Sequence, residues 1–472
     1  MFHLYSIEKK MKKFLNISLL TLVALSSFTL TSCLNEMEDI FDDDAVIRLN
    51  NARDEYFDIL TKDGGKWKLE YFSNTGEPGY TYILTFKKDG MVTMSGHNKW
   101  INYIKNNSLN GSTFGSEDSM WELIFDNSLV LSFNTYNKYF HFFASPDKVP
   151  TGGASGDGIA NTLGYGHRGD YEFNIMKYSN DTIYLTGKKN DLPMFLTKLP
   201  SDTPDESYLG AVAVWNKTLF SSSIPYVFLV LPDGKRWIIE GASTCNLRMY
   251  RENDDKISNS EYHNTIITHD GLAFMNPLTL DGYEFQWFAR QDDGTLVSVT
   301  NPDIRIVGDD LENYLFYDYA KNNVLTWVAD LDVSKTGIGG RYIDLVTKIN
   351  TEVPNMKGYK KTSKLIDSRI YYSPDDNSFV FRLTVKKNTE ASPEAYYFIN
   401  PEIQANSQVK FEITGMNSYA QTIKNECPTI DELLNVLTTT TYKLTATSML
   451  APTTIQMTEV GSAENFFVWN IK

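Results

Sequence analysis

The feature that most constrains the fold is an alternation of apolar and polar residues that begins at Trp67. A period of two sends successive side chains to opposite faces of a β-strand. Turn signals such as Lys88-Asp89-Gly90 separate these segments and predict hairpins. The predicted strands of this first series are 66–72, 80–86, 91–96, 120–125, 129–136, 139–144, 171–178, 182–188 and 194–199. Such a succession predicts an up-and-down antiparallel barrel or a related sandwich.

A second β-rich series follows a short polar segment. Residues 200–207, PSDTPDES, contain two prolines and no large apolar side chain, which is typical of a linker. Beyond them the alternating strands resume, and helical spacing predicts helices at 341–352 and 429–437. The string DGYEFQW at 281–287 echoes GDYEFNI at 169–175 and suggests that the second domain is related to the first.

These patterns predict a mainly β protein with two antiparallel, barrel-like (lipocalin-like) or sandwich domains, at 46–199 and 208–472. A few accessory helices are expected. One of them opens the first domain, because apolar residues from Val46 to Leu60 recur at helical spacing and Gly64-Gly65 follow them.

The N-terminus has the layout of a lipoprotein signal. Two lysines precede an apolar segment from Phe14 to Leu30, and Leu30-Thr31-Ser32-Cys33 closes it. We predict that residues 1–32 are a signal peptide, with the true start at Met11, and that Cys33 is lipidated. An uncleaved membrane helix is one alternative, although the segment is short and interrupted by polar residues. An ordinary cysteine beside an ordinary signal is the other.

Residues 33–45 form an acidic tether behind this cysteine. The run LNEMEDIFDDD carries six acidic residues and no basic residue. One interpretation is a solvated spacer that self-repulsion keeps extended. The other is an export address that sends the protein to the outer face of the outer membrane.

The charge balance restricts the partners. The formal net charge is −15, which argues against nucleic acid, whose phosphates require clustered basic residues. It also argues against electrostatic attachment to an anionic membrane, so the lipid on Cys33 has to be the anchor. The other two cysteines, Cys245 and Cys427, lie far apart in sequence, and we expect two isolated buried thiols.

Several strings together resemble an uncharacterised family of Bacteroidetes-type surface lipoproteins with lipocalin-like β domains. They include the acidic tether, the helix before Gly64-Gly65, and the strings LSFNTYN (131–137), HFFASP (141–146), GDYEF (169–173) and LTGKK (185–189). The resemblance covers roughly residues 33–300. It implies antiparallel domains and a role in nutrient capture beside outer-membrane transporters. The family has no established catalytic residues, so the resemblance implies none here.

No stretch specifies a reaction. Gly164 to Gly169 matches the G-x-G-x-x-G string of dinucleotide sites, but a loop precedes it and a strand follows it, so the required strand and helix are missing. We read 151–169 as a long loop at a barrel rim, where binding residues are often found. The adjacent acid pairs look like turn residues rather than glycosidase pairs; they are Asp254-Asp255, Asp292-Asp293 and Asp309-Asp310.

Histidines and aromatic residues are the remaining candidates. The histidines form no H-E-x-x-H pattern, and His141 lies in an apolar segment where a satisfied core imidazole is expected. The sequence therefore predicts no metal site and no cofactor. Trp100, Trp237 and Trp287 are candidate platforms for sugar rings if they are exposed; the alternative is that they belong to the core.

Our leading hypothesis from sequence is a non-enzymatic binding or accessory lipoprotein of the outer membrane, exposed at the cell surface. We expect its ligand to be a glycan, a peptide or another nutrient, taken up with the help of a transporter. A surface hydrolase with a loop-built site and a structural or adhesive lipoprotein are the alternatives. Convergent acids or histidines around a cleft would favour the hydrolase, and filled barrels the structural role.

Overall fold

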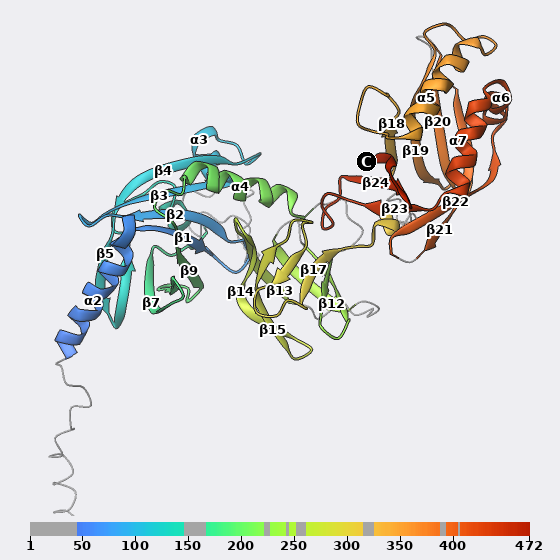
Figure 1. The fold of residues 1–472 in the computed structure, drawn as a ribbon. Helices are drawn as coiled ribbons and strands as arrows, with labels where there is room; N and C mark the ends of the chain where they lie inside the picture. Colours follow the sequence, from blue (N-terminus) through green and yellow to red (C-terminus); the bar gives the residue numbers. More distant parts are fainter. Residues whose placement is uncertain are drawn as a thin grey trace, which may run out of the picture. The chain divides into compact units, whose positions relative to one another are not determined.

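A computed structural model describes residues 45–145, 167–220, 227–241, 245–251, 261–314, 325–387, 393–404 and 406–472. These residues form three antiparallel β-sheets and several short helices (Figure 1). The mainly β, barrel-like fold predicted from the sequence is confirmed. The predicted signal peptide and Cys33 lie outside the described residues, as do the tether residues before Ala45.

The predicted N-terminal helix is confirmed as α2 (Ala45–Thr61). A single 3-10 turn, η1 (Lys62–Gly64), follows it. Gly65 then adopts φ 63°, and a Cβ at this position would lie 2.1 Å from the carbonyl oxygen of Phe86. Only glycine fits this turn into the first strand, which explains the predicted helix stop.

The first sheet has nine strands in the order β4-β3-β2-β1-β9-β8-β7-β6-β5. Its order places the consecutive strands β4 and β5 at opposite ends of the sheet, although Trp121 alone separates them along the chain. The sheet must therefore curl into a half-barrel. The strands are β1 (Lys66–Tyr71), β2 (Tyr80–Phe86), β3 (Met91–Asn98), β4 (Thr113–Met120), β5 (Glu122–Asp126), β6 (Ser128–Ser132), β7 (Glu172–Ser179), β8 (Thr182–Gly187) and β9 (Pro193–Lys198).

Strand β1 is buried on both faces. On one face, Trp67, Leu69 and Tyr71 belong to an aromatic core in which Tyr71 contacts Phe140 and Phe143. On the other face lie Lys68, 8% exposed, and Glu70, fully buried. Their side chains form an ion pair of 2.8 Å between Lys68 Nζ and Glu70 Oε1.

Helix α4 (Asp205–Thr218) covers strands β2 and β3 on this polar side (Figure 1). The helix starts inside the segment 200–207, which the sequence suggested as a linker. Asp205 fixes its first turn, because its carboxylate accepts hydrogen bonds from Lys66 Nζ at 2.8 Å and from Ser95 Oγ at 2.8 Å. The buried face of the helix carries Leu209, Val212 and Ala213.

One predicted strand is wrong. Residues 139–144 were expected to continue the sheet, but His141–Ala144 form a 3-10 helix, η2. The Asn137 side chain starts this turn by accepting hydrogen bonds from the backbone N–H groups of Tyr139 and Phe140. The prediction that His141 is a satisfied core imidazole is confirmed, since its Nε2 lies 2.9 Å from the Phe133 carbonyl oxygen and its Nδ1 accepts from Asn137 N.

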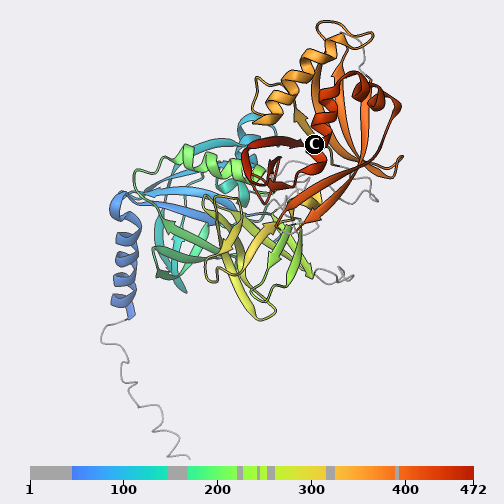
Figure 2. The same ribbon diagram turned by 45° about the vertical axis from the view of Figure 1, so that its right-hand side comes forward.

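The second sheet is a closed eight-stranded barrel, in which β10 pairs with β17 (Figure 2). Its interior is filled by apolar side chains, including Leu229, Leu247, Phe274, Phe285 and Ile306. Its strands are β10 (Val227–Val230), β11 (Arg236–Glu240), β12 (Asn246–Arg251), β13 (Tyr262–Ile267), β14 (Gly271–Leu280), β15 (Tyr283–Arg290), β16 (Leu296–Ser298) and β17 (Arg305–Gly308).

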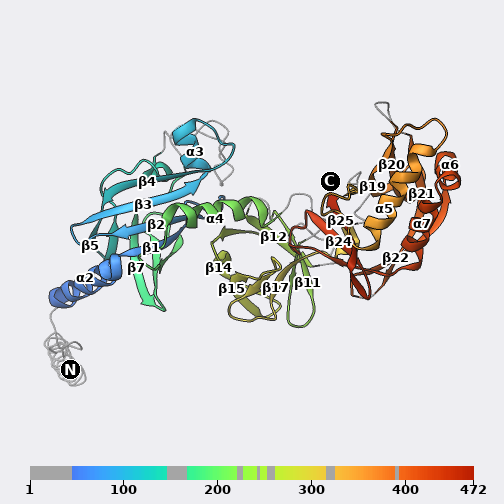
Figure 3. The ribbon, with the colours of Figure 1, turned by 45° about the horizontal axis from the view of Figure 1, so that its top comes forward.

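The third sheet is also a closed barrel, through the pairing of β18 with β25. The predicted helices 341–352 and 429–437 are confirmed as α5 (Arg341–Glu352) and α7 (Pro428–Thr439), and α6 (Ser418–Glu426) lies beside α7 against the strands (Figure 3). The strands are β18 (Trp327–Asp330), β19 (Lys364–Ser373), β20 (Ser378–Lys386), β21 (Glu394–Gln404), β22 (Gln408–Met416), β23 (Tyr442–Thr445), β24 (Thr454–Glu459) and β25 (Ser462–Ile471). Residues 208–472 thus contain most of α4 and two separate barrels.

Cys245 and Cys427 are buried and unpaired, as predicted. Burial raises the pKa of both thiols to about 12, so neither is a thiolate at neutral pH. Among the residues described, no helix is both long enough and apolar enough to span a bilayer.

Candidate functional site

Apolar side chains fill the interiors of both closed barrels, which favours a ligand site outside them. One candidate is a cavity of about 480 Å³, here called the junction cavity. Its walls come from the turn at 76–81, the end of β3 with the start of α3 (Lys99–Asn106), residues 111–112, helix α4 and the start of β12. The volume lies in the range of small-molecule sites.

The turn at 76–81 is held from both sides. Asn74 Oδ1 accepts a hydrogen bond from Gly76 N at 2.8 Å within the turn. From strand β13, Asn264 Nδ2 donates to the Glu77 carbonyl oxygen at 2.6 Å, and the carbonyl oxygen of Thr265 accepts from Gly79 N at 3.0 Å. The cavity wall is therefore built from ordered backbone.

Behind this wall lies a buried polar cluster. The Glu77 carboxylate binds His167 Nδ1 through Oε1 and accepts from Tyr80 OH at 2.9 Å through Oε2. Trp100 Nε1 in turn donates to Tyr80 OH at 2.7 Å. Burial, and next the nearby Glu77, raise the pKa of Tyr80 well above its usual range. Both oxygens of the Glu77 carboxylate are therefore bonded within the cluster, which fixes Glu77 and with it the cavity wall.

The polar groups of the cavity itself are basic or neutral. Lys99 and Lys217 are exposed and line the cavity, together with the amides of Asn98, Asn216 and Asn246 and with His97. Burial lowers the pKa of His97, and Lys217 lowers it further, whereas the Ser112 backbone and Glu206 raise it; the net shift is downward, so the ring is neutral at pH 7. His97 Nδ1 and Asn246 Oδ1 are buried and have no hydrogen-bond partner among the described residues.

Helix α4 supplies the apolar part of the lining. Leu209, Val212 and Ala213 contribute the aliphatic surface, and Pro78 adds to it from the turn. The cavity therefore combines one apolar wall with several separated polar groups, an arrangement that orients a small ligand.

The three tryptophans proposed as sugar platforms do not come together. Trp100 is 2% exposed and belongs to the support cluster behind the cavity. Trp237 lies in β11, where its Nε1 donates to Asp281 at 3.3 Å, and Trp287 lies in β15 with its ring 4.8 Å from that of Phe195. Trp100 is therefore a core residue, which was the alternative to a sugar platform.

Sequence reasoning missed the groups that line the junction cavity. Lys99, Lys217 and His97 carry no motif, and they meet only because α4 folds across β2 and β3. Among the residues described, no group of three or more His, Cys, Asp or Glu side chains is placed to hold a metal ion. The acid pair Asp292-Asp293 lies in a turn as predicted, where Asp293 Oδ1 accepts from Thr295 N at 2.9 Å.

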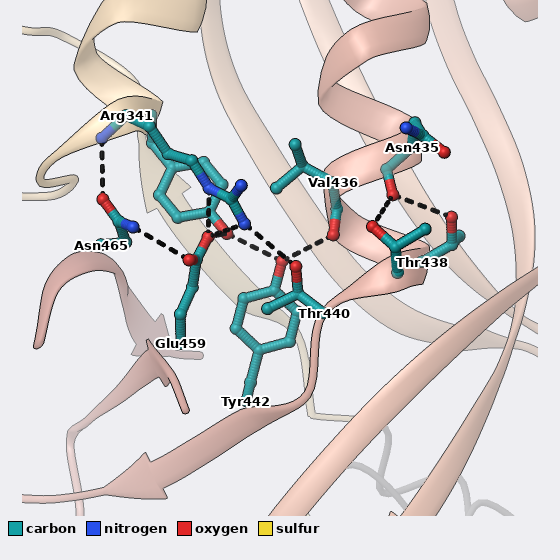
Figure 4. A network of polar contacts seen from close by, with 10 residues as sticks. Arg341, Asn435, Val436, Thr438, Thr440, Tyr442, Glu459 and Asn465 are labelled. Atoms are coloured by element: carbon teal, nitrogen blue, oxygen red, sulfur yellow. Dashed lines mark hydrogen bonds and ion pairs between the residues drawn. The ribbon is translucent and has the colours of Figure 1, made fainter. Parts of the chain in front are cut away.

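A second polar cluster lies in the third barrel (Figure 4). Glu459, 7% exposed, accepts from Arg341 Nε at 2.5 Å, from Tyr342 OH at 2.6 Å and from Asn465 Nδ2 at 2.9 Å. Tyr342 OH also lies 2.8 Å from Tyr442 OH. The carboxylate is saturated by groups that join the start of α5 to the β24-β25 hairpin, so this cluster has a structural role.

Comparisons with known proteins identify the family. A family model described as a domain of unknown function, DUF4302, matches residues 37–292, more than half of the chain. The chain belongs to the DUF4302 family. All the residues that line the junction cavity fall within the DUF4302 match, whereas the cluster at Glu459 lies outside it. No curated protein matches the chain.

A comparison with solved structures adds nothing about the fold of this DUF4302 protein. The beta chain of DNA polymerase III from Streptococcus pneumoniae is 10% identical in sequence, with 89% of this chain and 97% of that chain covered. The TM-score is 0.13, which carries no argument about fold or function.

The strings noted within the DUF4302 region are explained by the half-barrel. Asp170, from GDYEF, accepts hydrogen bonds from Lys189 N at 2.8 Å and from Asn190 N at 3.2 Å, and thereby holds the turn that follows LTG. Its own carbonyl oxygen accepts from Tyr71 OH at 3.0 Å. A Cβ on Gly187 would lie 2.3 Å from Asp170 Oδ2, so glycine is required there. These residues bond to one another and stabilise the half-barrel.

Proposed function

We propose that this protein is a lipid-anchored, surface-exposed outer-membrane protein that binds a small polar ligand in the junction cavity. The observation that carries the binding role is the cavity itself, with ordered walls and a volume of about 480 Å³. Its position inside the family region supports a role shared by relatives. Delivery of the ligand to a neighbouring transporter is part of the proposal and rests on the sequence resemblance.

Binding fits the lining better than hydrolysis does. A hydrolase needs a nucleophile beside a base, or two acids placed across a bond. Among the described lining residues, Glu77 supplies the carboxylate, and that carboxylate is already bonded to His167 and Tyr80. The thiol of Cys245, which also lines the cavity, is protonated. The second candidate function is a structural or adhesive role, which the filled interiors of both barrels favour.

Filling the cavity tests the binding role. We expect Ala213→Trp to abolish ligand binding, because Ala213 is 6% exposed and the indole would occupy the space between α4 and the turn at 76–81. The full chain in detergent is screened against a mixed library of neutral and charged small molecules by ligand-observed NMR. Val214→Trp, on the exposed side of the same helix, is the matched control. Hits that persist in Ala213→Trp would place the binding site outside the junction cavity, and the absence of hits would favour the structural role.

The anchor is tested separately in cells. Growth with an alkyne analogue of palmitate is expected to label the wild-type protein and to leave Cys33→Ala unlabelled, with Cys33→Ala lost from the outer-membrane fraction. Cys245→Ala is the control, because that thiol is buried in the folded protein and should not affect labelling. Labelling of Cys33→Ala, or its retention in the outer membrane, would refute the anchor. Protease treatment of intact cells then reports the exposed face.

A further inference from the structure

We infer that the ligand of the junction cavity is a small hydroxylated carboxylate, such as a sugar acid; this inference rests on the proposed binding function. The charges that the described lining can offer to a ligand are all positive. Lys99, at the start of α3, and Lys217, near the end of α4, are exposed and line the cavity. Lys99 Nζ also lies 4.9 Å from the centroid of the Trp100 ring.

The lining contributes no free anion. Glu77 is 3% exposed, and its two carboxylate oxygens face His167 and Tyr80. Glu206 acts electrostatically on His97 but does not line the cavity. Two lysines that line a cavity without a free carboxylate are unexpected in a chain of net charge −15. A ligand carboxylate would balance them.

The neutral groups indicate that the ligand also carries hydroxyls. His97 Nδ1, in the neutral ring, and Asn246 Oδ1 are both acceptors without a partner among the described residues. Buried acceptors are normally paired, and hydroxyl groups would supply the donors. The aliphatic wall of Leu209 and Val212 suits the C–H faces of a compact ring. Inorganic phosphate is a compact anion without C–H faces and without several hydroxyls spread around a ring.

The test compares three probes by isothermal titration calorimetry of the full chain in detergent: D-glucuronate, D-glucose and inorganic phosphate. We expect glucuronate to bind at least roughly tenfold more tightly than either of the others, since a charge-assisted contact is worth about that factor or more. Lys217→Met and Lys99→Met should each weaken glucuronate by about tenfold and leave glucose unchanged. Lys361→Met, in an exposed turn of the third barrel, is the control.

The outcomes separate this inference from the binding role. Equal binding of glucose and glucuronate would overturn the charge requirement while the cavity remained a binding site. Equal binding of phosphate would overturn the hydroxyl requirement. Glucuronate binding that survives Ala213→Trp would place the site elsewhere and overturn the inference. Failure of all three probes, with other ligands lost in Ala213→Trp, would refute the sugar acid but not the cavity.

Discussion

Lys68→Met is expected to lower the free energy of unfolding of the half-barrel by about 3–5 kcal/mol, because it leaves a buried carboxylate without its cation. Glu70 is fully buried, and its Oε2 has no hydrogen-bond partner among the described residues. Methionine keeps the aliphatic packing of the lysine, so the change isolates the charge. Chemical denaturation followed by hydrogen exchange of peptides from β1 measures the loss for this sheet alone.

A double variant and a pH series make this prediction specific. Lys68→Met with Glu70→Leu should recover most of the lost stability, since apolar pairs often replace buried ion pairs without cost. Burial lowers the pKa of Lys68, but the adjacent Glu70 outweighs it and the pKa is raised. A raised lysine pKa contributes stability below the usual value of about 10.4, and this contribution is lost only at higher pH. The ion pair of the wild-type protein should therefore stay charged between pH 6 and 9. An equally large loss in the exposed control Lys88→Met would contradict the assignment.

Glu459→Ala is expected to destabilise the third barrel by about 3 kcal/mol, the lower end of the range for a broken buried pair. The value is low because the Arg341 side chain is 42% exposed and can return to water. Asn465 cannot, and its buried Nδ2 would lose its carboxylate acceptor. Tyr342 OH would lose the same carboxylate and keep only its contact with Tyr442 OH. Thermal unfolding, read by hydrogen exchange of peptides from α5 and β25, measures the effect.

Glu464→Ala is the matched control for this second change. Glu464 lies on β25, the other strand of the same hairpin, and is exposed, so its loss should change the stability by less than about 0.5 kcal/mol. Glu459→Gln should fall between the two variants, since the amide keeps one acceptor for Tyr342 but loses the charge opposite Arg341. Equal stability of Glu459→Ala and wild type would show that the cluster contributes little.

The sequence was most informative where the apolar residues of a segment followed a single periodicity. Alternation located most strands, and helical spacing located α2, α5 and α7. Short elements that depend on single side chains were missed. Asn98 caps α3 by accepting from the N–H groups of Trp100 and Ile101, and Asn137 holds the turn before η2 by accepting from those of Tyr139 and Phe140. Helix α4 was missed because its first turn, in 200–207, is polar and rich in turn residues, and it forms against Lys66 and Ser95.

The relation suggested between 169–175 and 281–287 is not reflected in local structure. Asp281 and Gly282 both have positive φ and form the tight hairpin between β14 and β15. Asp170, in contrast, precedes β7 and holds the turn that follows β8. The candidate cavity could not be predicted either. Its lining comes from five separate segments, and no spacing along the chain marks residues that a helix crossing brings together.

Trp121 gives the half-barrel a property that the two closed barrels lack. In those barrels, hydrogen bonds between the first and last strands close the ring. In the half-barrel, the peptide link through a single residue keeps the two end strands from separating, and Trp121 is anchored through its backbone N–H on Gly90 and its ring on Phe86. Closure here is covalent. Inserting residues between β4 and β5 would let the sheet flatten and expose its core, although the link has the length of an ordinary hairpin turn.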